Sequence, residues 1–196
     1  MILQGNICYL RDPTLNDMNE FRNWYQPHQD WLQWDCPWRV FHPQEFEQMK
    51  ANIEQQICQS KTGMIRQRLE LCTNNHQHIG WVSSYFLNQN PQQIAIGITI
   101  VDTYHRGKGY GTQAYVLYIH YLLTCNYTNI FTQTWSGNHR MMQLANRLCF
   151  TEVERLTNYR NVNGCLYDQI TYQLHVPCFL KQFCSDIDPV TIDQPY

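Results

Sequence analysis

The amino-acid sequence predicts an α+β fold, with a mixed and mostly antiparallel twisted sheet of roughly six to seven strands flanked by about four helices. Two patterns of strand-forming residues, 65–86 and 152–174, are each interrupted by turn residues and therefore predict antiparallel hairpins. A third pattern, 94–135, runs strand, helix, strand, which predicts a right-handed parallel crossover. We expect a single domain over residues 1–174, followed by a tail over residues 175–196.

The composition excludes several classes of protein. Of the 196 residues 43% are hydrophobic and 15% charged, and the net charge is −2. A nucleic-acid binder would show a basic excess and a membrane protein an apolar run of about 20 residues, and the sequence has neither. The first residues also lack the basic and apolar regions of a signal peptide. We therefore expect a cytoplasmic protein without nucleic-acid or membrane partners, and the sequence leaves open whether it forms a homodimer.

Cysteine and histidine spacing argues against two further features. There are nine cysteines, an odd number, and no Cys-x-x-Cys pair, so we expect reducing surroundings rather than a disulfide framework. His76 and His78 have a spacing that metal ligands use, but no cysteine or carboxylate cluster completes a site in the sequence. We predict no metal.

Strand patterns and helix signals alternate along the chain. The predicted strands are residues 7–11, 65–73, 78–86, 94–101, 129–135, 152–159 and 165–174. Thr14 is a typical N-cap for a first helix, which ends at Pro27. Pro43 suits the first turn of a second helix, which ends by Gly63. Two further helices follow the central strand and the strand after it.

The most informative stretch is 94–112. Isoleucines at every second position predict a buried strand, and a glycine-rich turn, 106–112, then precedes an amphipathic helix. The first N–H groups of a helix lack internal partners, and glycines let an anion approach the main chain closely. The stretch therefore predicts a phosphate-binding turn. Its spacing matches neither a P-loop nor a dinucleotide-binding fingerprint.

The motif Arg106-x-x-Gly109-x-Gly111, placed between a β-branched strand and an amphipathic helix, resembles the acyl-CoA pyrophosphate loop of the GNAT superfamily of N-acetyltransferases. The closest branch in character is that of ribosomal-protein-alanine and small-amine acetyltransferases. Asn138 then opens a helix that runs to Phe150, as in the family. The resemblance spans residues 7–174. It implies the GNAT fold, in which two parallel strands splay apart at the cofactor site.

The resemblance implies an acetyl-CoA-dependent N-acetyltransferase that acts by direct attack of a primary amine in a ternary complex. The acceptor would be a small molecule or a protein N-terminus. The Val101 N–H would polarise the thioester carbonyl, and Asn138 would reach the pantetheine arm or an ordered water. The pyrophosphate would be held by the main-chain amides of Arg106, Gly107, Lys108, Gly109, Tyr110, Gly111 and Thr112.

Four of the six tryptophans lie between residues 24 and 38. They either seal the end of the core or form a wall of the acceptor site. In the second interpretation Trp31, Trp34 and Trp38 supply apolar walls. Asp30 and Asp35 then attract a cation, and we expect a cationic or aromatic amine to be favoured over an acidic one. Asp35 is the best candidate for the base, because tryptophans that exclude water would raise its pKa.

Neither of the family's usual proton-transfer groups is in place. Ala95 stands where many relatives have an acidic residue, Ala145 where many have a tyrosine, and Cys149 where they have a glycine. Glu70 and Tyr104 are weaker candidates for a base. An alternative function is therefore a CoA-binding module of the same fold without turnover. A fold kept only for protein interaction is a third, against which the intact loop argues.

Overall fold

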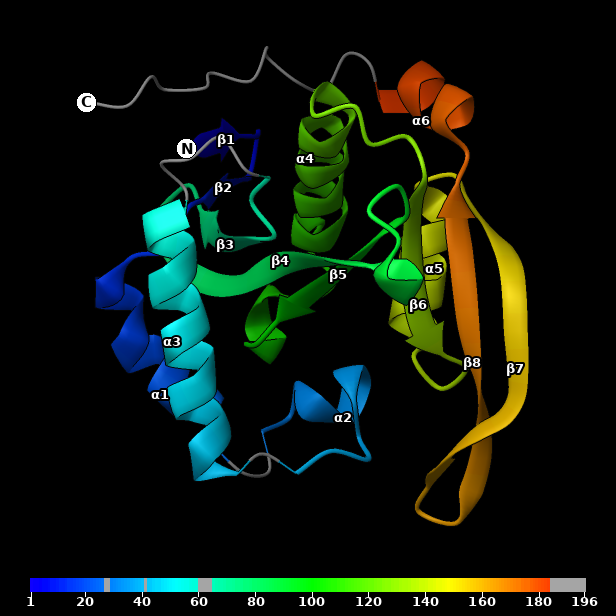
Figure 1. Cartoon of the computed structure of the whole chain (residues 1–196), viewed down its shortest axis with the longest axis horizontal. Helices are drawn as coiled ribbons and strands as arrows, with labels where there is room; N and C mark the ends of the chain where they lie inside the picture. Colours follow the sequence, from blue (N-terminus) through cyan, green and yellow to red (C-terminus); the bar gives the residue numbers. More distant parts are fainter. Residues whose placement is uncertain (27–28, 41, 60–64, 184–196) are drawn as a thin grey trace.

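The computed structural model describes residues 1–26, 29–40, 42–59 and 65–183 (Figure 1). The helix ends predicted at Pro27 and Gly63, and the tail beyond residue 183, lie outside these ranges. The strands are β1 (Ile2–Gln4), β2 (Cys8–Arg11), β3 (Arg68–Thr73), β4 (His78–Phe86), β5 (Ile94–Ile100), β6 (Ile130–Trp135), β7 (Phe150–Val162) and β8 (Cys165–Leu174). The helices are α1 (Met18–Trp24), α2 (Leu32–Asp35), α3 (Pro43–Gln59), α4 (Tyr110–Thr124), α5 (His139–Arg147) and α6 (Val176–Phe183).

The eight strands form one sheet in the order β1-β2-β3-β4-β5-β6-β8-β7. Every pair is antiparallel except β5 and β6, so the predicted mixed, mostly antiparallel α+β fold is confirmed. The additional strand is β1, which has three residues and too short an alternation to be recognised. Helices α2 and α6 were also not expected.

Alternation along the strands divides the helices between the two faces. Leu69, Val82 and Ile96 point to the face covered by α4, α5 and α6, where the main core lies. Trp81, one position from Val82, points the other way and packs with Trp31 in a smaller cluster beside α1 and α2. Figure 1 shows α4 against the middle of the sheet, with α1 and α3 at the opposite end from the β7–β8 hairpin.

Strands β5 and β6 pair at only two positions, Ile94 with Ile130 and Ala95 with Phe131. Beyond these positions they diverge, while β6 continues to pair with β8 as far as Trp135. The splayed parallel strands implied by the family resemblance are therefore present. The gap they leave is the main interruption of the sheet.

A buried ion-pair network lies beneath α1. His78 Nε2 is 2.9 Å from Glu70 and its Nδ1 is 3.2 Å from Glu20, while Arg68 pairs with Glu70 at 2.6 Å. Burial alone would raise the pKa of Glu70, but the guanidinium of Arg68 and the imidazole outweigh it and hold that pKa below its usual value. Carboxylates do gather at His78, which the sequence did not show, and they engage both of its ring nitrogens.

The first part of the expected tail belongs to the packed structure. Phe179 of α6 is fully buried in the main core, so residues Val176–Phe183 of the expected tail pack against the rest of the domain. Cys178 forms a disulfide with Cys149, a pairing that the cysteine count and spacing did not predict. Cys149 has a φ of 62°, the left-handed conformation that explains why a glycine suits this position after α5. None of the helices in the described ranges is long and apolar enough to span a membrane.

Candidate active site

The gap beside β5 leaves one edge of that strand without a partner strand. The Ile94 N–H donates to the oxygen of Asn129, towards β6. Every second N–H of a strand points the same way, so those of Ile98 and Ile100 point into the gap. These two amides are therefore placed to donate hydrogen bonds to a bound ligand.

Val101 does not have the position that its predicted role needs. Its N–H donates to the oxygen of Ile79 at 3.0 Å, on the β4 side of the strand. Its side chain packs against the cluster of Trp31 and Trp81. The prediction that this amide polarises a thioester carbonyl is wrong for this conformation, because the amide is already bonded. The predicted residue lies one position after Ile100, whose N–H points into the gap, so the Val101 N–H points to the opposite edge of the strand.

The glycine-rich turn leads into α4 as the sequence predicts. Gly107 and Gly109 have φ values of 73° and 91°, in the left-handed region that side chains disfavour. Among the described residues, the N–H groups from Gly107 to Thr112 have no main-chain acceptor. Such a row of N–H groups, at the positive end of the helix dipole, is a general binding site for phosphate. The Arg106 N–H, which was also expected to hold the pyrophosphate, already donates to the oxygen of Thr103.

The Arg106 side chain bonds to other groups of the protein. Its guanidinium donates to the oxygens of Ile100 (2.8 Å) and Val101 (2.6 Å) and also pairs with Asp30. Asp30 is thus engaged by Arg106, which removes the reason for expecting it to attract an acceptor amine. The pair instead ties the segment before α2 to the end of β5.

The larger of two adjoining cavities, about 480 Å³, lies between this turn, β5 and α5. Its lining includes Trp31, Trp34, Asp35, Ile98, Thr99, Ile100, Thr103, Arg106, Gly107, Gly109, Gly111, Thr112, Asn138, Arg140, Met141, Gln143, Leu144 and Arg147. Arg140 and Arg147 add two positive charges that sequence reasoning missed. Their signal was the seven-residue spacing, which places both on one face of α5.

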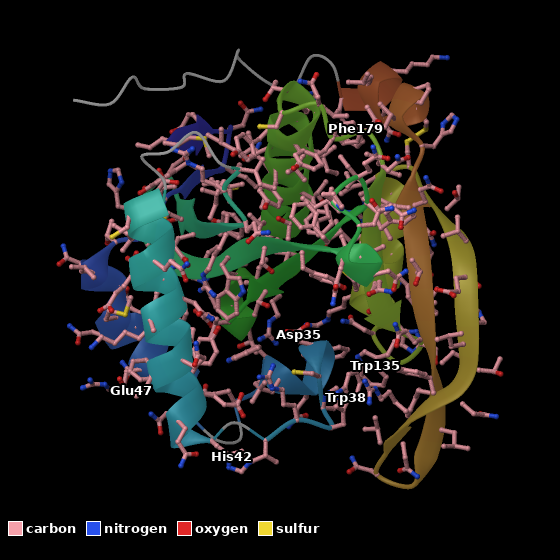
Figure 2. All side chains as sticks on the ribbon, viewed as in Figure 1. Asp35, Trp38, His42, Glu47, Trp135 and Phe179 are labelled. Atoms are coloured by element: carbon pink, nitrogen blue, oxygen red, sulfur yellow. A yellow bond between two sulfur atoms is a disulfide. The ribbon has the colours of Figure 1, made fainter. Side chains whose placement is uncertain are left out.

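The smaller cavity, about 290 Å³, lies on the other side of α2. It is lined by Asp35, Trp38, Tyr85, Gly97, Ile98, Tyr115, Thr132, Gln133, Thr134, Trp135, Asn138, Met141, Tyr159, Arg160 and Gln169. Figure 2 shows Asp35, Trp38 and Trp135 close together between α2 and the ends of β6 and β8. Four residues, Asp35, Ile98, Asn138 and Met141, line both cavities and mark where they meet.

Asp35 has an unusual environment at this junction. Although Asp35 is exposed to solvent, partial desolvation by the surrounding protein raises its pKa to about 6, against the opposing effect of Arg39. A carboxylate with such a pKa is ionised at neutral pH and still basic enough to share a proton. Asp35 therefore stays the candidate for the general base that the sequence predicted.

Asn138 joins the two walls of the junction. Its side-chain oxygen accepts a hydrogen bond from the Met141 N–H and caps α5, and its amide nitrogen donates to the oxygen of Trp34 at 2.8 Å. The indole N–H of Trp135 donates to the same oxygen at 2.9 Å. These bonds hold α2, and with it Asp35, against β6 and α5.

The three tryptophans predicted for the acceptor wall divide between the cavities. Trp31 and Trp34 line the larger cavity, where the Arg140 guanidinium lies 4.1 Å from the Trp34 ring centre. Trp38 lines the smaller cavity. Trp31 is also buried in the core cluster beside α1. Trp31 therefore helps to seal the core, as one interpretation of the segment expected, while Trp34 and Trp38 line cavities, as the other expected.

The other proposed bases lie away from the junction. Glu70 belongs to the buried ion-pair network, and Tyr104 is 70% exposed with the Lys108 ammonium over its ring. Ala95 and Ala145 are both fully buried and line neither cavity. Asp35 is the only carboxylate that the described residues contribute to either cavity.

Comparison with known proteins supports one family. The family model described as "Acetyltransferase (GNAT) domain" matches residues 8–151. No curated protein matches the sequence. Similar solved structures include a ribosomal-protein-S5-alanine acetyltransferase from Vibrio fischeri, with 20% identity, a TM-score of 0.71 and coverage of 88% of this chain and 95% of that one.

Two further structures share the fold. A spermidine N-acetyltransferase from Vibrio cholerae, in complex with CoA and spermine, has 18% identity and a TM-score of 0.68, over 85% of this chain and 94% of that one. A GNAT-family acetyltransferase from Bacillus anthracis has 13% identity and a TM-score of 0.68, over 89% and 98%. Because the family model covers well over half of the sequence, the chain belongs to the GNAT family of acetyltransferases.

Proposed function

We propose that this protein transfers the acetyl group of acetyl-CoA to a primary amine, either of a small molecule or of a protein N-terminus. The observation that carries the proposal is the junction of the two cavities at Asp35. The larger cavity offers main-chain N–H groups and arginines suited to the phosphates of CoA, and the smaller one can hold an acceptor.

The roles of the chain's own residues follow from their positions. Bound acetyl-CoA supplies the acetyl group as an activated thioester. The amides from Gly107 to Thr112 and the side chain of Arg147 bind phosphate, and the amides of Ile98 and Ile100 donate to oxygen atoms in the gap. Asp35 takes a proton from the acceptor ammonium, which makes the amine nucleophilic. Holding both reactants at one junction supplies much of the remaining rate enhancement.

Ala145 does not exclude turnover. A tyrosine at this position would donate a proton to the departing thiol, but an ordinary thiol has a pKa of about 8.5 and can take its proton from water. The alternative of a CoA-binding module without turnover therefore rests only on the absence of that tyrosine and of an acid at position 95. Asp35 provides a base from another element, which favours catalysis.

Two measurements test the proposal together. Calorimetry with acetyl-CoA measures binding, and a thiol-release assay with a panel of primary amines measures turnover. We expect binding in the micromolar range and thiol release that depends on the amine. Binding without release for any amine would support the CoA-binding module, and no binding would refute both functions.

A further inference from the structure

We infer that Arg160 binds a carboxylate group of the acceptor, so that the acceptor is an amine with a carboxylate close to it. This inference rests on the proposed function and identifies its substrate class. The smaller cavity has two charged residues among the described ones that line it, Asp35 and Arg160. One attracts an ammonium group and the other an anion.

The Arg160 guanidinium is not neutralised by the protein. No acidic group is recorded as its partner within the described ranges. Its carbon atom Cζ lies 5.1 Å from the ring centre of Trp38 and 4.6 Å from that of Tyr159. The two rings fix the direction of the side chain while leaving its N–H donors unused, as a carboxylate-binding arginine requires.

A two-residue bulge in β7 moves Arg160 along the hairpin until it lies level with Tyr167. Leu156 of β7 pairs with Gln169 of β8, but Arg160 pairs with Tyr167, so β7 contains two extra residues over this interval. Paired residues share a face of the sheet, and so do residues two apart. Gln169 lines the cavity, and Tyr167 and Arg160 therefore lie on that same face.

The bulge is held in place by specific bonds. Asp168 accepts a hydrogen bond from the Asn158 N–H at 3.1 Å and pairs with Arg155 at 2.9 Å. The Asp168 N–H and C=O both bond to Ser136, at the end of β6. Bulges are over-represented beside active sites. The bonds tie the position of Arg160 to the strand that forms the opposite wall of the cavity.

Size and charge narrow the acceptor further. A volume of 290 Å³ is at the lower end of ligand pockets, roughly 300–1,000 Å³, and suits a group of one or two amino acids. A polyamine would place a second positive charge near Arg160 and be repelled. The expectation of a cationic or aromatic acceptor rested on the tryptophan rings and on Asp30 and Asp35. In the structure Asp30 pairs with Arg106, and Arg160 lines the cavity.

The experiment compares acceptors that differ only in one carboxylate. One pair is an amino acid and its amide, and the other is a short peptide with aspartate or asparagine in second position. These pairs distinguish a free α-carboxylate from an acidic side chain near a protein N-terminus. Each is measured for KM in the thiol-release assay and for Kd by calorimetry in the presence of CoA.

Three variants complete the experiment. Arg160→Gln removes the charge at an exposed position and should leave folding unchanged. Arg22→Gln is the matched control, since Arg22 is an exposed arginine of α1 that lines neither cavity. Arg160→Glu reverses the charge and should shift the preference towards diamines.

For at least one pair we expect the wild-type protein to prefer the carboxylate-bearing member by roughly 10- to 100-fold in KM and Kd. Arg160→Gln should remove this preference without a matching change in kcat, and Arg22→Gln should retain it. Equal values for both members of each pair, or a preference that survives Arg160→Gln, would overturn the inference. Calorimetry gives this answer even if no amine is acetylated, a result that would refute the proposed function separately.

Discussion

The two cavities that meet at Asp35 are built in different ways. The larger one is built around a single stretch of chain, the end of β5 and the turn into α4, which offers main-chain N–H groups, and α5 adds polar side chains. The smaller one takes its wall from α2, β4, β5, α4, β6, α5, β7 and β8, and uses side chains. The first kind of site is set by local backbone geometry, and the second by how distant elements pack.

This difference has a functional meaning. Main-chain N–H groups bind phosphate whatever side chains surround them, so a common donor can be bound by proteins of very different sequence. Side chains such as those of Trp38 and Arg160 discriminate between acceptors, because their charge and shape change with each substitution. We therefore expect substitutions at the turn to affect donor binding and substitutions around the smaller cavity to affect the acceptor.

The largest effect is expected at Gly111. A Cβ atom here would meet Ile100, Leu144 and Ile98 side chains at 3.8–3.9 Å, which is ordinary contact, so Gly111→Ala should fold normally. The longer branches of Gly111→Val would enter the larger cavity and displace the phosphates. We expect Gly111→Val to abolish the rise in melting temperature with acetyl-CoA, and Gly111→Ala to retain most of it. An unchanged shift in Gly111→Val would place the donor elsewhere.

Asp35→Asn tests the residue shared by the two cavities. Removing a general base typically costs 10²–10⁴-fold in rate, and we expect a loss of kcat in this range with little change in acetyl-CoA affinity. Because burial raises the pKa of Asp35 to about 6, kcat/KM of the wild-type protein should rise with pH through this value as the carboxylate ionises. The pH profile of Asp35→Asn should lack that limb. A variant with wild-type kcat would show that Asp35 is not the base.

Two tryptophan variants test whether the larger cavity binds the donor and the smaller one the acceptor. Trp34→Ala removes the ring beneath Arg140 and should raise KM for acetyl-CoA by roughly two- to fivefold. Trp38→Ala, at a ring beside Arg160, should instead raise KM for the acceptor. Steady-state kinetics with each substrate varied in turn separates the two. A change in the same KM from both variants would show that the cavities act as one site.

The sequence predicted the local features well. The isoleucine alternation, the turn at 106–112 and the cap at Asn138 all depend on residues that are neighbours in the chain, and the structure places them as expected. The prediction for Val101 was wrong because it assigned the N–H of this residue to the wrong edge of β5. The edge depends on which neighbouring strand takes each amide, and β4 and β6 lie on opposite edges of β5.

The acceptor side could not be predicted in the same way. Arg160 lies level with Tyr167 because two extra residues in β7 shift the hairpin register. An alternation pattern does not show this shift along the strand, since an insertion of two residues leaves the faces unchanged. Likewise, the engagement of Asp30 depends on Arg106, which lies 76 positions along the chain. Only Asp35, flanked by aromatic residues that are close in sequence, gave a signal that pointed to its position at the junction.

The smallest expected effect concerns the stability of the apo protein and distinguishes Asp35 from the carboxylates of the ion-pair network. The pKa of Asp35 is raised from an ordinary 3.8 to about 6 in the folded protein. Between these two pH values the folded state keeps a proton that the unfolded state has lost, so ionising Asp35 lowers the free energy of unfolding as the pH rises. Asp35→Asn should therefore raise the melting temperature slightly at pH 7 and leave it nearly unchanged at pH 4.

Glu70 has a lowered pKa, so its ionised form stabilises the fold, and Glu70→Gln should lower the melting temperature at pH 7. Thermal unfolding of both variants at the two pH values measures this contrast. A lower melting temperature of Asp35→Asn at pH 7 would mean that the ionised carboxylate stabilises the junction, contrary to its raised pKa.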